Sequence, residues 1–424
     1  MHLRRIRIED LRSIRELEWS FDEGAEAGWH VVLGNNGSGK SSVLRAIALG
    51  MLTPRDGEAL RQDTHRWVRR GAEKFEIRLA MSDASSTNLS SGAKSYERYI
   101  AEQSDIRNLK RQIWSEARDE SPGEQRYFSS SFGPFRRLGS RHRAKPEVPV
   151  AVARHLSLFG ENDELVDGLE WLQDLEFRAL KARERGTEST EQAALLLPRI
   201  RAFVNETGLL PFGARLGDIT PDGVQFVDGS GIELAVEELS DGYRSTIGLT
   251  FELIRQLAEH YGANAIWSSA SEGPPTITAA GIVLIDEVDA HLHPSWQRDI
   301  GGWFTSWFPN IQFIVTTHSP LICQAAVRGS ILRLPDPGQD ELPRVVTGLE
   351  RERLLFGNVL DALATESFGR VPSRSDAGRR KLERLAELNQ KSLREGLDET
   401  ELDEREHLLE ILPTRRDGAL DAAE

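Results

Sequence analysis

Residues 34–42 read GNNGSGKSS, and they directly follow the apolar run WHVVL at residues 29–33. The nonapeptide fits the pattern G-x4-G-K-[ST] through Gly34, Gly39, Lys40 and Ser41. Glycines let backbone N–H groups wrap around phosphates, and the helix expected over SSVLRAIALGML offers its positive N-terminus. This order of strand, glycine-rich turn and helix predicts a phosphate-binding loop. Its predicted nucleotide contacts are Asn35, Asn36, Gly37, Ser38, Gly39, Lys40, Ser41 and Ser42.

Two side chains of this loop have specific predicted roles. Lys40 is expected to reach the β- and γ-phosphates, and the Ser41 hydroxyl is expected to bind Mg²⁺. The alternative is a glycine-rich turn without a ligand. The strand before the loop and the helix after it are the context that the phosphate-binding motif requires.

A second motif lies far downstream, where residues 281–294 read GIVLIDEVDAHLHP. The apolar run Ile282 to Ile285 predicts a buried strand, and Asp286 follows at its carboxyl end, where ligands of α/β folds bind. Asp286 is predicted to hold the Mg²⁺ ion, and Glu287 to act as the general base toward the attacking water. A strand that ends in Asp-Glu is common, so a buried cap or an ion pair is the alternative.

Two further segments are weaker when each is taken alone. Residues 238–246 read ELSDGYRST and open a helix expected from about Ser245, so Ser240 and Gly242 could form an anion site. Many helices begin with Ser-Asp-Gly, however. Residues 314–320 read IVTTHSP and place His318 just beyond a predicted strand, where an isolated histidine is usually structural.

Composition limits the class of protein. The chain has 424 residues, of which 39% are hydrophobic and 28% charged, enough for two domains or for one large α/β domain with a lobe. Its single cysteine, Cys323, excludes an internal disulfide and a cysteine-cluster zinc site. No run approaches the roughly 18 apolar residues of a membrane span, and the N-terminus has no apolar leader segment. A soluble, cytoplasmic protein without a membrane partner is expected.

The net charge of −14 argues against a protein that coats nucleic acid with its whole surface. It does not exclude a local basic groove. A basic cluster falls within FGPFRRLGSRHRAK and comprises Arg136, Arg137, Arg141, His142, Arg143 and Lys145. The cluster is either a solvated charged surface or a surface that faces phosphates.

Hydrophobic periodicity predicts an alternation of strands and helices. Strands are expected at residues 2–8, 15–20, 29–33, 75–80, 126–131, 281–286 and 311–317. Helices are expected within residues 41–52, 150–206, 245–260 and 296–308, and a β-meander at 214–239. Residues 82–125 are expected to be an insertion that opens with the serine-rich loop SDASSTNLSSGAKS.

The order of the four motifs resembles the ABC-type ATPase heads of the SMC, RecF and related families. That resemblance implies a composite site, in which the LSGGQ-like segment of one head caps the γ-phosphate bound to the other. By the same resemblance Asp286 is the Walker B aspartate, Glu287 the base and His318 the switch histidine. It makes Asp289 to His293 the D-loop equivalent, and ATP with Mg²⁺ the ligands.

Several details depart from that family. LSDGY differs from LSGGQ at Asp241 and Tyr243, although Ser240 and Gly242 are retained. The segment Leu11-Arg12-Ser13 resembles the family's F-[RK]-S, which implies that Arg12 and Ser13 contact the nucleotide. The Q-loop glutamine is unassigned, because RYFSSSFGPFRR has only Gln125 ahead of it. His291 and His293 are not predicted to bind a metal, because the sequence offers no third ligand beside them.

The resemblance implies an α/β P-loop NTPase fold of ABC-type head architecture, with a mixed sheet, an antiparallel β-subdomain, a helical lobe and a C-terminal helical tail. The expected head is residues 1–345, with its helical lobe at 150–210, and the charged helical region is 346–424. Residues 376–412 predict a helical hairpin with one apolar face, which either packs on its own head or docks a partner.

The chain lacks the long heptad insertion of SMC proteins and is similar to compact ATPases of phage-defence operons, such as the Septu ATPase, which works with an HNH nuclease. This implies a homodimer or a higher even oligomer, an HNH-type nuclease partner and possible DNA contact. The main alternative is a RecF-like ATPase of DNA repair or recombination. A detached transporter ATPase and an NTP-sensing scaffold are two others.

Overall fold

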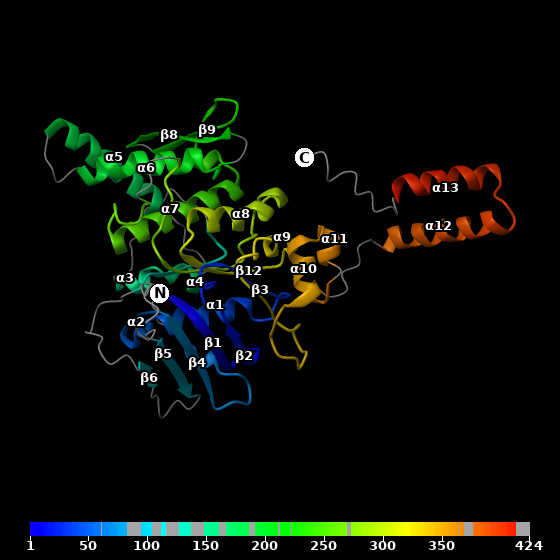
Figure 1. Cartoon of the computed structure of the whole chain (residues 1–424), viewed down its shortest axis with the longest axis horizontal. Helices are drawn as coiled ribbons and strands as arrows, with labels where there is room; N and C mark the ends of the chain where they lie inside the picture. Colours follow the sequence, from blue (N-terminus) through cyan, green and yellow to red (C-terminus); the bar gives the residue numbers. More distant parts are fainter. Residues whose placement is uncertain are drawn as a thin grey trace. The chain divides into compact units, whose positions relative to one another are not determined.

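The computed structural model describes thirteen stretches of the chain, namely residues 1–60, 62–82, 95–103, 112–115, 127–136, 148–160, 167–185, 191–210, 213–221, 223–268, 273–363, 365–368 and 376–412. The chain divides into two compact units, Met1–Phe368 and Gly369–Glu424. The first unit contains three sheets and most of the helices (Figure 1).

A six-stranded sheet forms the centre of the first unit. Its strands, in spatial order, are β14 (Arg344–Val345), β13 (Ile331–Arg333), β3 (Gly28–Leu33), β12 (Ile311–Thr317), β11 (Gly281–Ile285) and β7 (Ser129–Phe132). All neighbours run parallel except β13 and β14, so the sheet is mixed as predicted. The carboxyl ends of the five parallel strands therefore meet at one edge, which is where α/β folds bind ligands.

Both faces of this sheet are covered, which explains why its strands read as continuous apolar runs. In β3, Trp29, Val31 and Leu33 face one hydrophobic core, and Val32 between them faces a second core. The first core contains side chains of α5 (Asp167–Arg185), α6 (Glu191–Glu206), α7 (Asp241–Tyr261) and α8 (Pro294–Trp307). The second contains those of α1 (Lys40–Met51) and of an antiparallel sheet.

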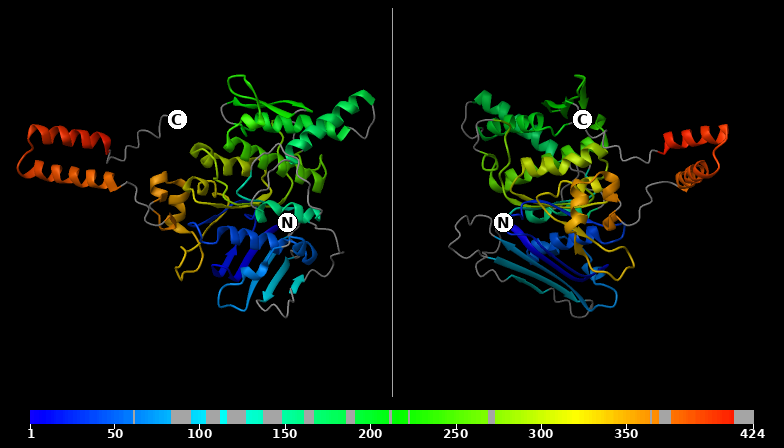
Figure 2. Two further views of the ribbon diagram at one scale, coloured as in Figure 1. Left: turned by 180° about the vertical axis from the view of Figure 1, so that it is seen from behind. Right: turned by 45° about the vertical axis from the view of Figure 1, so that its right-hand side comes forward.

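That antiparallel sheet has the order β2 (Ile14–Ser20), β1 (His2–Leu11), β4 (Lys74–Ser82), β5 (Ser95–Gln103) and β6 (Gln112–Ser115). It lies against α1 at the opposite end of the unit from the helices α5 and α6 (Figure 2). The strands β5 and β6 correct the expected insertion at 82–125, which therefore includes an extension of the sheet. The serine-rich residues before SYERYIAEQ favour a loop, so the sequence does not predict this strand. Residues 83–94 lie outside the described part of the chain.

The helical lobe carries a small third sheet. Strands β8 (Arg215–Thr220), β9 (Gly223–Val227) and β10 (Glu233–Ala235) are antiparallel, as the predicted meander requires. Asp228 fixes the second turn, because its carboxylate accepts hydrogen bonds from the backbone N–H groups of Ser230 and Ile232 at 2.8 and 2.9 Å. The sheet lies beside α5 and α6 (Figure 1).

Helix α7 begins at Asp241 with Ser240 as its N-cap residue, four positions before the predicted start near Ser245. The sequence Ser-Asp-Gly looks like a turn, but an N-cap serine and an aspartate in the first turn are also what a helix N-terminus favours. The remaining short helices of the unit are α2 (Pro54–Ala59), α3 (Val150–Ala153), α4 (Leu156–Phe159), α9 (Pro320–Cys323), α10 (Gly348–Phe356) and α11 (Val359–Leu363), with 3-10 turns at Thr64–Trp67, Val236–Glu238 and Glu366–Phe368.

The first unit extends past residue 345 because α10 and α11 contribute to its core. Leu354, Leu355 and Ala362 are buried in the same cluster as β3 and β12. The charged helices therefore begin a separate unit only after Phe368.

The second unit is the predicted helical hairpin, made of α12 (Asp376–Arg394) and α13 (Glu399–Ile411). Its small core consists of Leu385, Leu388, Leu408 and Leu412. Exposed ion pairs, such as Arg384 with Glu404 at 2.9 Å, also join the two helices. Among the helices that the structure describes, none has the length and apolar character to cross a membrane.

Candidate nucleotide site

The loop between β3 and α1 closes around the side chain of Lys40. The Lys40 ammonium donates hydrogen bonds to the carbonyl oxygens of Gly34 at 2.8 Å and Asn35 at 3.2 Å. Lys40 is 6% exposed, whereas Asn35, Asn36 and Gly37 at the tip of the loop are exposed. The loop thus holds a buried cation beneath an open tip.

Glycines are required in this loop by the backbone and by the space around it. Gly37 and Gly39 have φ values of +80° and +104°, in the left-handed region that favours glycine. A Cβ atom on Gly39 would also lie 2.6 Å from the Ser13 hydroxyl oxygen. These two glycines therefore allow the chain to make the tight turn that joins β3 to the N-terminus of α1.

His318, just beyond the end of β12, contacts the phosphate loop directly. Its Nε2 atom lies 2.8 Å from the Lys40 ammonium. Burial lowers the pKa of His318, and the charge of Lys40 lowers it further. Burial also lowers the pKa of Lys40, against the opposing charges of Glu287, Asp286 and Asp289. A neutral His318 therefore accepts a hydrogen bond from the Lys40 ammonium.

Asp286 and Glu287 follow β11 at the same edge of the sheet. Asp286 is 1% exposed, and its Oδ1 atom accepts a hydrogen bond from the Thr316 hydroxyl at 2.6 Å. The same hydroxyl accepts a hydrogen bond from the backbone N–H of Glu287 at 2.7 Å. Thr316 therefore fixes both residues. The sequence motif IVTTHSP contains Thr316, but the motif alone does not predict this role, because Thr316 and Asp286 are 30 positions apart in the sequence.

The turn after Glu287 is tied to the same strand. The Thr317 hydroxyl donates to the Asp289 carboxylate at 2.6 Å. His293 caps the N-terminus of α8, where its ring accepts a hydrogen bond from the backbone N–H of Ser295 at 3.3 Å. Within the described residues, no group of three or more His, Cys, Asp or Glu side chains is placed to hold a metal ion.

The signature segment, defined as residues 238–246, occupies a different position. Ser240 and Asp241 are exposed, and Gly242 packs on the turn after β11, where a Cβ atom would lie 2.6 Å from the His291 carbonyl oxygen. In the part of the chain that the structure describes, no hydrogen bond joins Ser240 or Gly242 to the phosphate loop. The fold thus brings Lys40, Asp286, Glu287 and His318 together at one edge and leaves Ser240 and Gly242 outside that group.

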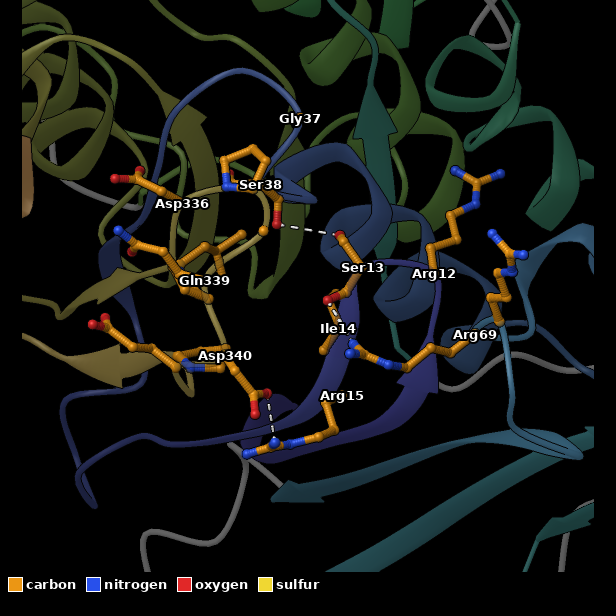
Figure 3. Close-up of a pocket in the computed structure, with 17 residues that line it drawn as sticks. Arg12, Ser13, Ile14, Arg15, Gly37, Ser38, Arg69, Asp336, Gln339 and Asp340 are labelled. Carbon is orange, nitrogen blue, oxygen red and sulfur yellow. Dashed lines mark hydrogen bonds and ion pairs between the residues drawn. The ribbon is translucent and has the colours of Figure 1, made fainter.

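Arg12 and Ser13 lie beside the loop, as their predicted role requires. The Arg12 guanidinium stands 4.9 Å from the ring centre of Trp67, and its Nη1 atom donates to the Ser42 hydroxyl at 3.3 Å. The Ser13 hydroxyl donates to the Ser38 carbonyl oxygen at 3.4 Å. Both residues line a cavity of about 570 Å³ that opens next to the phosphate loop (Figure 3).

The far wall of this cavity is the loop of residues 335–343. Asn35 donates to the Asp336 carboxylate at 2.7 Å, and Arg15 forms an ion pair with Asp340 at 2.6 Å. In Figure 3, Asp336, Gln339 and Asp340 face Ser13 and Arg15 across the cavity. Gly37 and Ser38 of the phosphate loop also line the cavity, which is therefore continuous with that loop.

Both interpretations of the basic cluster fail for Arg136, the cluster member that the structure describes. Arg136 is 3% exposed, and its guanidinium binds the carbonyl oxygens of Gly133, Asp286 and Glu287. It is neither solvated nor turned toward a phosphate-binding surface, because the side chain is buried and both of its terminal amino groups donate to those backbone oxygens. The remaining residues of the cluster, and Gln125, lie outside the described residues.

Comparison with known families agrees with this geometry. A family model described as "AAA domain, putative AbiEii toxin, Type IV TA system" matches residues 30–324, which include the phosphate loop, Asp286, Glu287 and His318. The chain belongs to this AAA family. The fold is accordingly that of an α/β P-loop NTPase with a mixed sheet, an antiparallel sheet and a helical lobe.

Two curated relatives of this AAA protein are a Septu protein and a probable ATPase of a retron. It is 26% identical over 335 residues to the Septu protein PtuA of Bacillus mycoides (strain KBAB4), covering 78% of this chain and 40% of that protein. It is 38% identical over 122 residues to the Retron Ec83 probable ATPase of Escherichia coli, covering 29% of this chain and 21% of that protein. The chain thus spans less than half the length of either relative.

Among solved structures, the AAA protein is similar to an SMC head bound to the C-terminal winged-helix domain of ScpA. The TM-score is 0.49 and the sequence identity 16%, with 83% of this chain and 99% of that chain covered.

Proposed function

We propose that this protein binds ATP with Mg²⁺ and hydrolyses it to ADP and phosphate. The observation that carries the proposal is the buried ammonium of Lys40 inside the loop at the N-terminus of α1. Among the described residues, no carboxylate lies within ion-pair distance of it. A buried cation next to free helix N–H groups creates a site for an anion, and the triphosphate of ATP supplies that anion.

The donors at the sheet edge fit a magnesium ion. The Ser41 hydroxyl and the Asp286 carboxylate are hard oxygen donors, which Mg²⁺ prefers, and Thr316 orients Asp286. When bound, Mg²⁺ would neutralise charge that develops on the phosphate oxygens.

The chain's own residues then carry the reaction. Glu287 accepts a proton from the attacking water while the water oxygen forms a bond to the γ-phosphorus. The bond between the γ-phosphorus and the oxygen that bridges it to the β-phosphate breaks, and ADP leaves with that oxygen. Lys40 binds the β- and γ-phosphates, and His318, held 2.8 Å from Lys40, contacts the γ-phosphate. Arg12 and Ser13 contact the nucleotide from the cavity beside the loop.

The complete site forms between two copies of the chain, in a homodimer or a higher even oligomer. Ser240 is exposed, and the half-buried Gly242 packs against the turn at His291 rather than against its own phosphate loop. In a pair of heads related by a two-fold axis, each signature segment can cap the γ-phosphate held by the other head.

The ATP cycle is proposed to control a partner nuclease of HNH type in anti-phage defence, with possible contact to DNA. The support for this role is the similarity to the Septu protein PtuA, together with the retron ATPase.

The test of the proposed function is hydrolysis by the purified chain. We expect Glu287→Gln to lower the rate of phosphate release by about 10²–10⁴-fold while ATP binding survives, because the amide cannot accept a proton. Phosphate release and the affinity for a fluorescent ATP analogue are measured together. Glu352→Gln, at an exposed position of α10, is the matched control and should match the wild type. A Glu287→Gln variant with the wild-type rate would overturn the assignment of the base.

A further inference from the structure

Arg136 is a buried cation to which the proposed hydrolysis assigns no role. It lies four residues after the end of β7, and its guanidinium donates to the carbonyl oxygens of Gly133 at 2.9 Å, of Glu287 at 2.8 Å and of Asp286. Burial lowers the pKa of Arg136 to about 10, against the opposing charges of Asp286, Asp289 and Glu287. The side chain is therefore still charged at neutral pH, although no carboxylate of the described residues forms an ion pair with it.

The contact depends on an unusual backbone conformation at Glu287. In a regular extended strand, successive carbonyl groups point to opposite sides, so one guanidinium binds two in a row only where the strand ends or is interrupted, as at the bulge in β8. The chain leaves the strand conformation after Ile285, and Glu287 has a φ of +47°, in the left-handed region. This turn lets the carbonyls of Asp286 and Glu287 converge on the two amino groups of Arg136. A left-handed glutamate is unfavourable by itself and needs surrounding contacts to hold it.

Contacts on both sides of Glu287 supply that support. Arg136 binds its carbonyl oxygen, and the Thr316 hydroxyl binds its N–H group. The two peptide groups that flank the Glu287 side chain are thereby fixed from opposite directions. Their positions determine the direction in which the Glu287 carboxylate leaves the backbone.

The support behind Arg136 is itself rigid. A Cβ atom on Gly133 would lie 2.1 Å from the Ser157 carbonyl oxygen, and the Gly133 N–H donates to the Ser157 hydroxyl at 3.3 Å. Asp286 is also joined to β7 by a backbone hydrogen bond to Phe132 at 2.9 Å. The segment from β7 to Arg136 is therefore a firm base from which the turn at Glu287 is held.

We propose that Arg136 is a positioning residue that holds Glu287 in its left-handed conformation and so directs the base toward the attacking water. This inference rests on the proposed function, because it assigns Arg136 a role through Glu287.

The test uses the full chain with Arg136→Lys, which retains the charge but cannot bind two carbonyls as a planar fork, and Arg136→Gln, which retains a planar donor. We expect kcat to fall by about 10- to 100-fold in both, because small misplacements of a reacting group have effects of that size. The affinity for ATP should stay within about threefold, since Lys40 and the loop are untouched. Arg201→Lys is the matched control, because Arg201 binds the successive carbonyls of Leu216 and Gly217 far from the site.

A double variant separates positioning from general stability. If Arg136 acts through Glu287, Arg136→Lys should lower the residual rate of Glu287→Gln by less than about twofold. A merely structural role would lower that residual rate by the same factor as in the wild type. The inference would be overturned if Arg136→Lys lowered the rates of the wild type and of Glu287→Gln by the same factor. A wild-type kcat in a folded Arg136→Lys, or loss of folding in both Arg136 variants, would also overturn it. If the wild type itself releases no phosphate, the proposed function fails instead.

Discussion

The phosphate loop and the signature segment both lie at the start of a long helix, but their surroundings are opposite. In the loop, Lys40 is buried and is bonded to Gly34, Asn35 and His318. In the signature segment, Ser240 is the N-cap residue of α7, yet its exposed side chain makes no capping hydrogen bond. One helix start is preorganised within the chain, and the other is presented outward.

This difference indicates that the two helix starts have different roles in the proposed site: the loop binds phosphate within one head, and the signature segment acts on the other head. A group that must bind phosphate in a single head needs internal partners to hold it before the nucleotide arrives. A group that acts on another head needs an accessible position and a firm base, which the close packing of Gly242 on His291 supplies. Mutations in the loop should therefore affect one head, whereas mutations in the signature segment should affect only the pair.

The largest expected effect is that of Lys40→Ala. Removing the buried ammonium should weaken ATP binding by about 100-fold or more, because a charge-assisted contact with the phosphates is lost. The melting temperature should change little, since the cost of burying the ammonium offsets its hydrogen bonds to Gly34, Asn35 and His318 in the free protein. A fluorescent ATP titration and a thermal melt check both points. Lys391→Ala in the hairpin is the control, and unchanged affinity in a folded Lys40→Ala would refute the loop assignment.

A smaller effect is expected from Thr316→Val. The substitution keeps the shape of the side chain but leaves the Glu287 N–H without its acceptor and Asp286 without its donor. We expect kcat to fall about tenfold and stability to fall by about 1–3 kcal/mol, as for a buried unsatisfied group.

Thr250→Val makes the same chemical change in the signature helix. The Thr250 hydroxyl donates within α7 to the Thr246 carbonyl oxygen at 2.9 Å, away from the phosphate loop. Its kcat should equal that of the wild type. Equal losses of kcat in Thr316→Val and Thr250→Val would show that the hydrogen bonds of Thr316 to Asp286 and Glu287 have no special role in turnover.

The smallest expected effect is a proton linkage at His318. Its pKa is lowered in the free protein by burial and by Lys40, and the negative charge of bound ATP would raise it. ATP binding should therefore take up protons, and affinity should increase by about two- to fivefold as the pH falls from 8 to 6.

The stability of the free protein should change in the opposite sense. The unfolded chain binds a proton at His318 near pH 6.5 and the folded chain only at lower pH, so stability decreases as the pH falls through 6.5. Calorimetry in two buffers with different ionisation enthalpies measures the proton uptake, with His318→Gln as the control. Equal uptake by the variant and the wild type would exclude His318 as the linked group.

Much of the preorganised edge could be predicted from the sequence, because its parts are local. The spacing of Gly34, Gly39 and Lys40 encodes a loop, and Asp286 with Glu287 follows a recognisable apolar strand. The roles of Thr316 and Arg136 could not be predicted, because their contacts with Asp286 join residues that are 30 and 150 positions apart. Nor does the local sequence distinguish a turn at Ser240 from the start of α7, since both favour the same residues.

The roles of the two helix starts are tested most directly in a heterodimer. Glu287→Gln removes the base of a head, and Ser240→Arg places a bulky cation where the signature segment would meet the other head. Each homodimer should bind ATP and release almost no phosphate. Two affinity tags allow one copy of each variant to be purified together as a defined pair.

In that pair, one composite site contains both defects and the other contains neither. The account predicts that its phosphate release regains up to about half the wild-type rate, as expected for one intact site of two in a symmetric dimer. A verified heterodimer that is as inactive as the two homodimers, or a Ser240→Arg homodimer with the wild-type rate, would contradict the composite site.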